Sequence, residues 1–313
     1  MKPVRLPAQL YRQFDADPAR AVPGEGYGGW HTVEAELAPK HTALVVMHAW
    51  DSGEPHEFPG WRRAVEYTPR ADRILREVFP PLLAAVRRSP LPVFHVVGGD
   101  KDYWSHLPGY QQTALLVRES PATPLVPRDP VLERMKLLRA EQGCPGKHNA
   151  ADVAAGFAQL DFAPQARPVG EEGIAKNGAQ LAALCRAHGV NHLVYAGFAL
   201  NWCLLMSPGG MVDMARHGCL CSTIPEATTA VENATTAREQ REKEQALWRV
   251  AVEFGFVFAL FDAGEIWVAD IAADPRNLTI FSAYRSPDYD AARCAKEGNC
   301  NGIVRATCSA HRT

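Results

Sequence analysis

The chain has 313 residues and 47% hydrophobic content, which is enough for a large core in one large domain or two ordinary ones. Its 33 basic and 35 acidic residues give a formal net charge of −2 without a basic block, which argues against a nucleic-acid surface. The N-terminus has no apolar segment of signal-peptide length, and no stretch approaches the roughly 20 apolar residues of a membrane span. We therefore expect a cytoplasmic protein whose eight cysteines are reduced thiols.

The chain divides into a main domain and two extensions. Residues 1–39 are rich in Pro, Gly and charge, with one strand-like piece at Thr32–Leu37, and they are expected to wrap the main domain. The main domain is predicted over residues 40–273, with an insertion at about 100–170 that carries one helix near Val131–Gln142. Residues 274–313 form a C-terminal extension.

Within the main domain, apolar runs typical of buried strands alternate with helical spacing. The predicted strands are Ala43–Met47, Val93–Val97, a weaker one at Ala166–Val169, His192–Gly197, Cys219–Ile224 and Phe256–Phe258. The predicted helices are Ile74–Val86, which Pro80-Pro81 should kink or split, then Leu181–Gly189, a stretch from Met211, and Arg238–Phe254. This alternation predicts a doubly wound α/β fold, a mostly parallel sheet flanked by helices on both faces, with the strand at 43–47 beside the strand at 192–197.

The segment Gly197–Cys203, GFALNWC, carries the clearest chemical signal. It joins a predicted buried strand to a helix, so the thiol of Cys203 lies where free backbone N–H groups favour a negative charge. Such a position favours a thiolate nucleophile, and the same N–H groups can hold a developing oxyanion. The alternative interpretation is a buried structural cysteine.

The stretch Asn177–Cys203, NGAQLAALCRAHGVNHLVYAGFALNWC, resembles the isochorismatase-like cysteine hydrolases, which include nicotinamidases and N-carbamoyl amidohydrolases. The resemblance extends over roughly residues 40–260 and implies their fold. In that family an Asp ending the first strand shuttles protons and a Lys after the third strand supports it. The backbone N–H groups of the Cys and of a residue shortly before it, often next to a cis peptide, form the oxyanion hole. The resemblance assigns these roles to Cys203 and Ala199, with Asn201 and Trp202 as further oxyanion or substrate-binding candidates.

Two positions depart from the family pattern. His48 stands where the Asp is expected, with Asp51 three residues on, and the Lys position falls near Gly170 while the nearest lysine is Lys176. We expect His48 to act as the proton shuttle, because a Cys–His pair can work as thiolate and imidazolium. Asp51 either supplies a carboxylate, orients His48 or caps its loop. Lys176 either supports the site or starts a helix as a solvated side chain.

The sequence thus predicts a hydrolase of a small amide, carbamoyl or ureido C–N bond that works through a Cys203 acyl-enzyme. The alternative is a catalytically degenerate relative that acts as a ligand-binding or assembly protein. No cofactor is expected, and no metal either, since even the tail residues Cys294, Cys300, Cys308 and His311 lack a Cys-x-x-Cys pair. The expected partners are a small-molecule substrate and other copies of the chain in a homo-oligomer, which the family resemblance implies.

Overall fold

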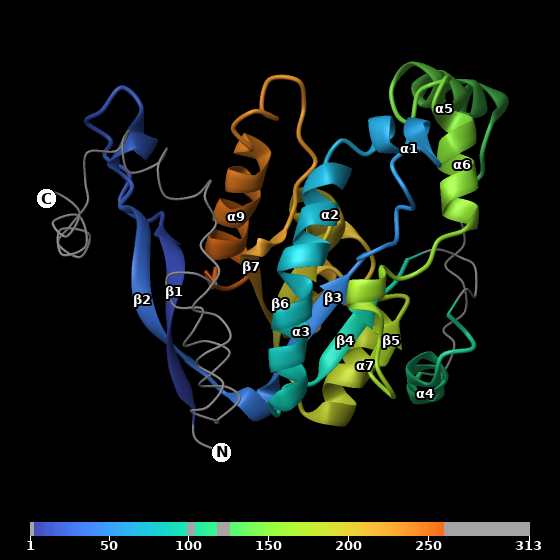
Figure 1. Ribbon diagram of the computed structural model, residues 1–313. Coiled ribbons are helices and arrows are strands. Elements are labelled where there is room, and N and C mark those ends of the chain that lie inside the picture. The colour runs from blue at the N-terminus through green and yellow to red at the C-terminus, as the bar shows by residue number, and fades with distance from the viewer. Residues whose placement is uncertain (1–2, 99–103, 118–125, 260–313) are drawn as a thin grey trace, which may run out of the picture.

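The computed structural model describes residues 3–98, 104–117 and 126–259. These residues form a five-stranded parallel sheet with helices on both faces (Figure 1), which is the doubly wound α/β class that the sequence predicts. The tail residues Cys294, Cys300, Cys308 and His311 lie outside the described residues, as do the proposed limits of the C-terminal extension. No helix within the described ranges is both long and apolar enough to cross a membrane.

The parallel strands lie in the order β5-β4-β3-β6-β7. They are β3 (Thr42–Met47), β4 (Val93–Val96), β5 (Gly173–Ala175), β6 (His192–Gly197) and β7 (Leu220–Thr228). From β3 the chain first adds β4 and then β5 on one side of the sheet, and it then adds β6 and β7 on the other side. The switch point therefore lies between β3 and β6, whose pairing confirms the predicted neighbours, and ligands are expected beyond the carboxyl ends there.

The central strand β3 is buried on both faces, which explains its uninterrupted apolar sequence. Leu44 and Val46 pack into one hydrophobic cluster, while Ala43, Val45 and Met47 pack into the cluster on the opposite face. This alternation follows from the two-residue period of a strand.

Helices cover both faces of the sheet (Figure 1). One cluster contains α2 (Thr68–Glu77) and α3 (Phe79–Arg88), which separate at Val78 as the Pro80-Pro81 pair predicts. The other contains α7 (Gly178–His188), α8 (Met211–Arg216) and α9 (Arg241–Glu253). The remaining helices are α1 (Pro59–Ala64), α4 (Pro108–Leu116), α5 (Pro130–Gln142) and α6 (Ala150–Ala158). Short 3-10 turns occupy Pro23–Gly26, Pro39–His41 and Pro164–Ala166.

The N-terminal residues form an antiparallel hairpin of β1 (Val4–Arg12) and β2 (Gly29–Leu37). Its apolar residues join the cluster that contains α2 and α3, so the hairpin packs on the core of its own chain. The sequence predicts only part of β2, because the proline at position 7 argues against a strand in β1. The hairpin is joined to the rest of the fold by two backbone hydrogen bonds between Gln9 and Val257, of 2.8 and 3.1 Å.

One predicted strand is wrong, and another is reduced to a single bridging residue. The strand expected at Ala166–Val169 is absent from that range, and the strand beside β4 is instead Gly173–Ala175. Three residues are too few to produce a recognisable periodic pattern. In the stretch Phe256–Phe258 only Val257 makes bridges, one to Thr223 and one to the N-terminal hairpin.

His95 interrupts the apolar sequence of β4 and is fully buried. Its Nε2 lies 2.9 Å from Glu172, whose carboxylate also accepts hydrogen bonds from Arg87 at 2.7 and 2.9 Å. Burial alone would raise the pKa of Glu172, but the hydrogen bonds from His95 and Arg87 outweigh it and lower the pKa to about 2. Burial lowers the pKa of His95, so a neutral imidazole hydrogen-bonded to Glu172 is the polar group that this buried strand contains.

The Glu172 ion pair should contribute stability that depends on pH. Because the folded-state pKa lies below the ordinary value of 4.5, this contribution is fully present above pH 4.5 and is lost as pH falls towards 2. We expect Glu172→Gln to lower the free energy of unfolding at pH 7 by about 1–3 kcal/mol, and to flatten its pH dependence between 4.5 and 2, in urea denaturation. The neighbouring exposed Glu171→Gln is the control, and equal losses in the two variants would contradict the assignment.

Candidate active site

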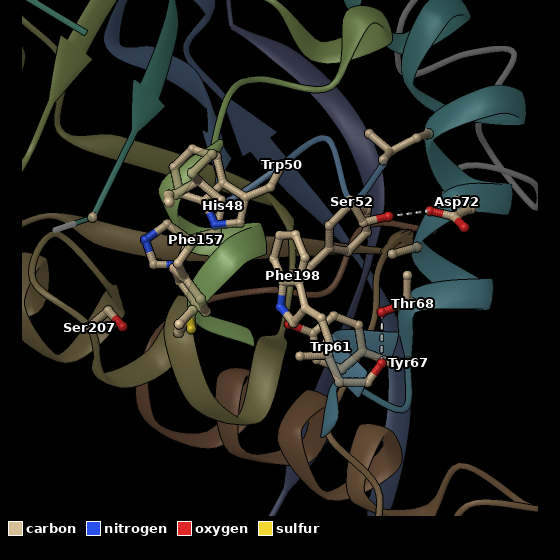
Figure 2. Close-up of a pocket in the computed structure, with 18 of the residues that line it drawn as sticks. His48, Trp50, Ser52, Trp61, Tyr67, Thr68, Asp72, Phe157, Phe198 and Ser207 are labelled. Atoms are coloured by element: carbon tan, nitrogen blue, oxygen red, sulfur yellow. Dashed lines mark hydrogen bonds between the residues drawn. The ribbon is translucent and has the colours of Figure 1, made fainter. Parts of the chain in front are cut away.

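A cavity of about 630 Å³ lies at the carboxyl ends of the parallel strands (Figure 2). Residues that follow four different strands line it: His48 after β3, Gly98 after β4, Lys176 after β5 and Cys203 after β6. The cavity thus lies where the doubly wound topology places a ligand site.

Most of the remaining wall is apolar and aromatic. Figure 2 shows Trp50, Trp61, Tyr67, Phe157 and Phe198 around the cavity, with Trp61 and Phe157 contributed by α1 and α6. The rings of Trp61 and Phe157 lie 5.5 Å apart, and those of Tyr67 and Phe198 lie 6.5 Å apart. The cavity therefore suits a small ligand with an apolar or planar part.

One carboxylate in the wall is already paired. The Asp72 carboxylate accepts hydrogen bonds from Ser52 at 3.2 Å and from Arg62 at 2.8 Å (Figure 2 shows the bond to Ser52). Since Arg62 neutralises this charge, Asp72 contributes little free negative charge to the cavity.

The turn that carries Cys203 begins with a close approach between strands. Gly197 has φ +127°, and a Cβ there would lie 1.9 Å from the Met47 carbonyl oxygen, so only glycine fits. A cis peptide joins Phe198 to Ala199, and a π-helical turn, Leu200–Leu204, follows. Cys203 is half-buried in this turn and faces the cavity.

Two backbone N–H groups of this turn, those of Ala199 and Cys203, were predicted as oxyanion donors. The N–H of Ala199 donates to no other group in the described part of the chain, and no bond there joins the N–H of Cys203 to a group outside the turn. The carbonyl of Ala199, by contrast, accepts from Trp202 and Leu204 at 3.3 and 3.1 Å and so holds the turn together. The two N–H groups can therefore receive a developing negative charge.

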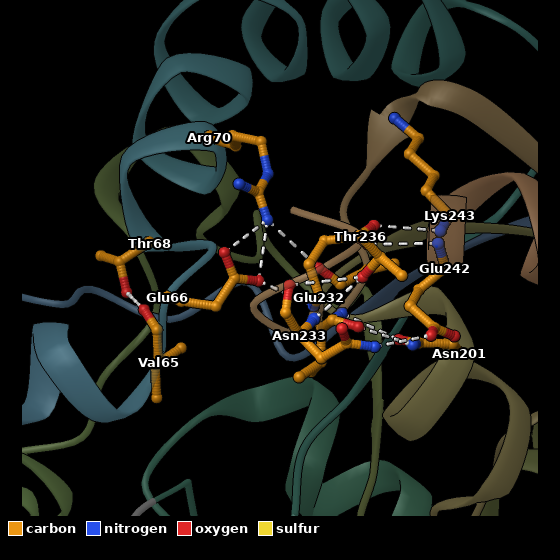
Figure 3. A network of polar contacts seen from close by, with 12 residues as sticks. Val65, Glu66, Thr68, Arg70, Asn201, Glu232, Asn233, Thr236, Glu242 and Lys243 are labelled. Carbon is orange, nitrogen blue, oxygen red and sulfur yellow. Dashed lines mark hydrogen bonds and ion pairs between the residues drawn. The ribbon is translucent and has the colours of Figure 1, made fainter. Parts of the chain in front are cut away.

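The other two predicted binding residues are not brought to the cavity. The Asn201 side chain donates to the Val231 carbonyl at 2.8 Å and accepts from the Val231 N–H at 2.9 Å, while the Leu200 N–H donates to Thr229 at 2.6 Å. These bonds hold the turn against the loop that follows β7 (Figure 3). Trp202 is 53% exposed and does not line the cavity.

His48 emerges at the end of β3 with a left-handed backbone, φ 54°. Its ring stacks on Trp50, with centroids 5.2 Å apart, and a Cβ at Gly98 would lie 3.2 Å from its Nε2. Burial lowers the pKa of His48 to about 4, so the imidazole is neutral at neutral pH. The structure thus places a neutral imidazole, held by an aromatic ring, in the same cavity as Cys203.

Of the two remaining candidates, Lys176 lines the cavity and Asp51 does not. Asp51 is exposed, does not line the cavity and accepts a hydrogen bond from the Gly53 N–H at 2.9 Å, as a loop-capping residue does. Lys176 follows β5 directly and lines the cavity, with Nζ 6.0 Å from the centroid of the Tyr110 ring. The expectation of a solvated helix start at Lys176 is wrong, because α7 begins at Gly178 behind the Asn177 cap. The sequence places the preceding strand at Ala166–Val169, whereas β5 lies at Gly173–Ala175, and this difference is why the expected lysine position falls near Gly170 instead of at Lys176.

Sequence reasoning missed the aromatic wall, Tyr67 included. These residues come from segments whose only sequence signal is an ordinary amphipathic or aromatic pattern, and packing alone brings them together. Among the described residues no group of three or more His, Cys, Asp or Glu side chains is arranged to hold a metal ion.

Comparison of the sequence with models of known protein families and with curated protein sequences finds no match. The structure is similar to a cysteine hydrolase from Pseudomonas syringae pv. phaseolicola 1448A, at 16% identity and a TM-score of 0.40, over 77% of this chain and 94% of that chain. It is also similar to an isochorismatase-like hydrolase from Alkaliphilus metalliredigens, at 15% identity and a TM-score of 0.42, over 72% of this chain and 98% of that chain.

A third similar structure is the YcaC gene product from Escherichia coli, described as an octameric hydrolase of unknown specificity. It is 14% identical, with a TM-score of 0.33, over 77% of this chain and 84% of that chain. Several of the similar structures are described as isochorismatase-family or isochorismatase-like proteins, the family that the segment before Cys203 resembles. At these identities the similarity concerns the fold.

The bonds between Asn201 and Val231 should stabilise the folded chain. We expect Asn201→Ala to lower the free energy of unfolding by about 1–2 kcal/mol, because the Val231 N–H and carbonyl lose their partners. Chemical denaturation measures the change. Trp202→Ala, in the same turn but exposed, is the matched control and should stay within about 0.5 kcal/mol of the parent. A larger loss in Trp202→Ala than in Asn201→Ala would show that this account of the turn is incorrect.

Proposed function

We propose that the protein is a cysteine-dependent hydrolase of a small amide, carbamoyl or ureido C–N bond, with Cys203 as the nucleophile. The observation that carries the proposal is the position of a half-buried thiol in a cavity that also contains His48 and Lys176. The N–H of Ala199, which has no acceptor among the described residues, supplies an oxyanion donor beside it.

The first step joins the thiol to the substrate carbonyl. His48 takes the thiol proton, the Cys203 sulfur attacks the carbonyl carbon, and the oxygen becomes negatively charged. The N–H groups of Ala199 and Cys203 receive that charge, and the ammonium of Lys176 favours it electrostatically. In an apolar cavity such interactions are stronger than in water.

The second step breaks the C–N bond. Protonated His48 returns its proton to the departing nitrogen, so that an amine leaves and a thioester on Cys203 remains. A pKa of about 4 makes the imidazolium a ready proton donor. Water, deprotonated by His48, then attacks the thioester, releases the acid and regenerates the thiol.

Association into a homo-oligomer stays a prediction from the family resemblance.

Cys203 should be alkylated by iodoacetamide faster than the other cysteines at neutral pH, because His48 of the same cavity takes the thiol proton as the sulfur attacks. Peptide mass spectrometry over time gives the rate at each cysteine. Cys144 is the internal control, since it is exposed whereas Cys203 is only half-buried. Faster labelling of Cys144 would contradict a nucleophilic role and would favour a catalytically degenerate binding protein.

Loss of His48 should remove the proton shuttle. With a substrate selected from a panel of amides, carbamoyl compounds and ureides, we expect His48→Ala to lower kcat by about two to four orders of magnitude. Because His48 is neutral above a pKa of about 4, the parent enzyme should keep its activity as pH falls from 7 to 5. Asp51→Ala is the control and should cost less. A greater loss in Asp51→Ala would assign the shuttle to the carboxylate.

A further inference from the structure

Ser52 and Asp72 form a polar patch in the cavity wall that the mechanism above does not use. Both side chains line the cavity, and the Ser52 hydroxyl donates to the Asp72 carboxylate at 3.2 Å (Figure 2). Asp72 is the only acidic side chain among the described residues that line the cavity. The other hydroxyl that α2 contributes to the wall, that of Thr68, already donates to the Val65 carbonyl at 2.7 Å.

The polar patch lies away from the reacting groups. In Figure 2 the patch is on one side of the cavity and Ser207 is on the other, with Phe198 between them in the view. Ser207 belongs to the end of the cavity that carries the nucleophile, since its N–H donates to the Cys203 carbonyl at 3.0 Å. A ligand that offers its carbonyl to Cys203 therefore meets the polar patch with its far end.

Arg62 fixes the Asp72 carboxylate in place. One terminal guanidinium nitrogen donates to Asp72 at 2.8 Å, and the other donates to the Gly53 carbonyl at 2.6 Å and to the Ser52 hydroxyl at 3.2 Å. A carboxylate has about four acceptor sites, and the described residues use two of those on Asp72. The remaining sites can accept a hydrogen bond from a ligand without rearrangement of the wall.

The charge of the polar patch favours a neutral donor. The Arg62 guanidinium compensates the Asp72 carboxylate, so the patch as a whole is close to neutral. A carboxylate on the ligand would face the Asp72 oxygens, and like charges repel strongly where water screens them poorly. A cation would give up its water for a carboxylate that already has a partner. A hydroxyl or an amide N–H has neither cost.

We propose that Ser52 and Asp72 form a subsite for the end of the substrate that does not react, and that this end carries a neutral hydrogen-bond donor, a hydroxyl or an amide N–H. The aromatic wall favours a planar or apolar middle part. This inference rests on the proposed function, because the other end of the ligand is taken to be the carbonyl that Cys203 attacks. It narrows the substrates to amides, carbamoyl compounds or ureides with a second, uncharged polar end.

The test compares probes that differ in one group. Para- and meta-hydroxybenzamide carry a donor at the far end of a planar ring, whereas para- and meta-methylbenzamide carry a methyl group of similar size there. Dissociation constants are measured by calorimetry in the full chain with Cys203→Ala, which cannot turn the probes over. We expect at least one hydroxyl probe to bind about tenfold more tightly than its methyl counterpart, and Asp72→Ala to remove this preference.

The control separates ligand binding from a structural effect, since Asp72 also joins α2 to α1 through Arg62. Asp152→Ala is matched, because the Asp152 carboxylate accepts the Gly60 N–H at 2.6 Å and so joins α6 to α1, but Asp152 does not line the cavity. This variant should keep the preference for the hydroxyl probe. Loss of the preference in Asp152→Ala as well would assign Asp72 a structural role only.

A second variant keeps the shape of the side chain and serves if Asp72→Ala folds poorly. In Asp72→Asn the amide oxygen can accept from Arg62, so the amide nitrogen offers a donor to the cavity. Para-methoxybenzamide, which can only accept, should then bind better relative to para-hydroxybenzamide than it does with Asp72 present.

The subsite and the proposed function can fail separately. Equal dissociation constants within both probe pairs, or no binding of any probe, would overturn the subsite. Hydrolysis is measured independently, as ammonia released from the same probes by the chain with Cys203 intact. Binding that depends on Asp72 without any release of ammonia would support the subsite and count against the hydrolase proposal.

Discussion

The close contact between the ends of β3 and β6 determines where the groups of the cavity lie. The backbone of Gly197 packs directly on the Met47 carbonyl, and the Phe198 N–H donates to that carbonyl at 3.1 Å. Met47 precedes His48, and Gly197 begins the turn that leads to Cys203. The imidazole and the thiol therefore start from two backbone segments in contact, and a side chain at position 197 would force them apart. This constraint is steric, and it is independent of the chemistry that the site performs.

Charge inside the cavity is controlled mainly by burial and by pairing. Burial keeps His48 neutral and Tyr67 protonated, while Asp72 is paired with Arg62 before any ligand arrives. Asp72 therefore does not compete with the substrate for the hydrogen-bond donors around Cys203. Such an environment strengthens each hydrogen bond to a developing charge, because charges near buried groups are screened less than exposed ones.

The parts that sequence reasoning predicted are those fixed by short-range patterns. The apolar sequences of β3 and β6 and the turn before Cys203 define the switch point, because buried parallel strands and strand-to-helix turns leave clear local signals. Lys176 was placed out of register because β5 has only three residues. The structural role of Asn201 and the presence of Tyr67 in the cavity depend on contacts between distant segments, which no local pattern encodes.

The pairing of Gln9 with Val257 has a consequence for how the chain is made. The N-terminal hairpin is synthesised well before Val257, its backbone partner almost 250 residues further along the chain. The hydrophobic cluster that receives the hairpin also needs residues of β6 and β7, which are synthesised late. Until then the hairpin exposes an unpaired edge and an apolar face, the kind of surface through which nascent chains associate incorrectly. Docking of β1 therefore has to wait until Val257 and the strands before it have been synthesised.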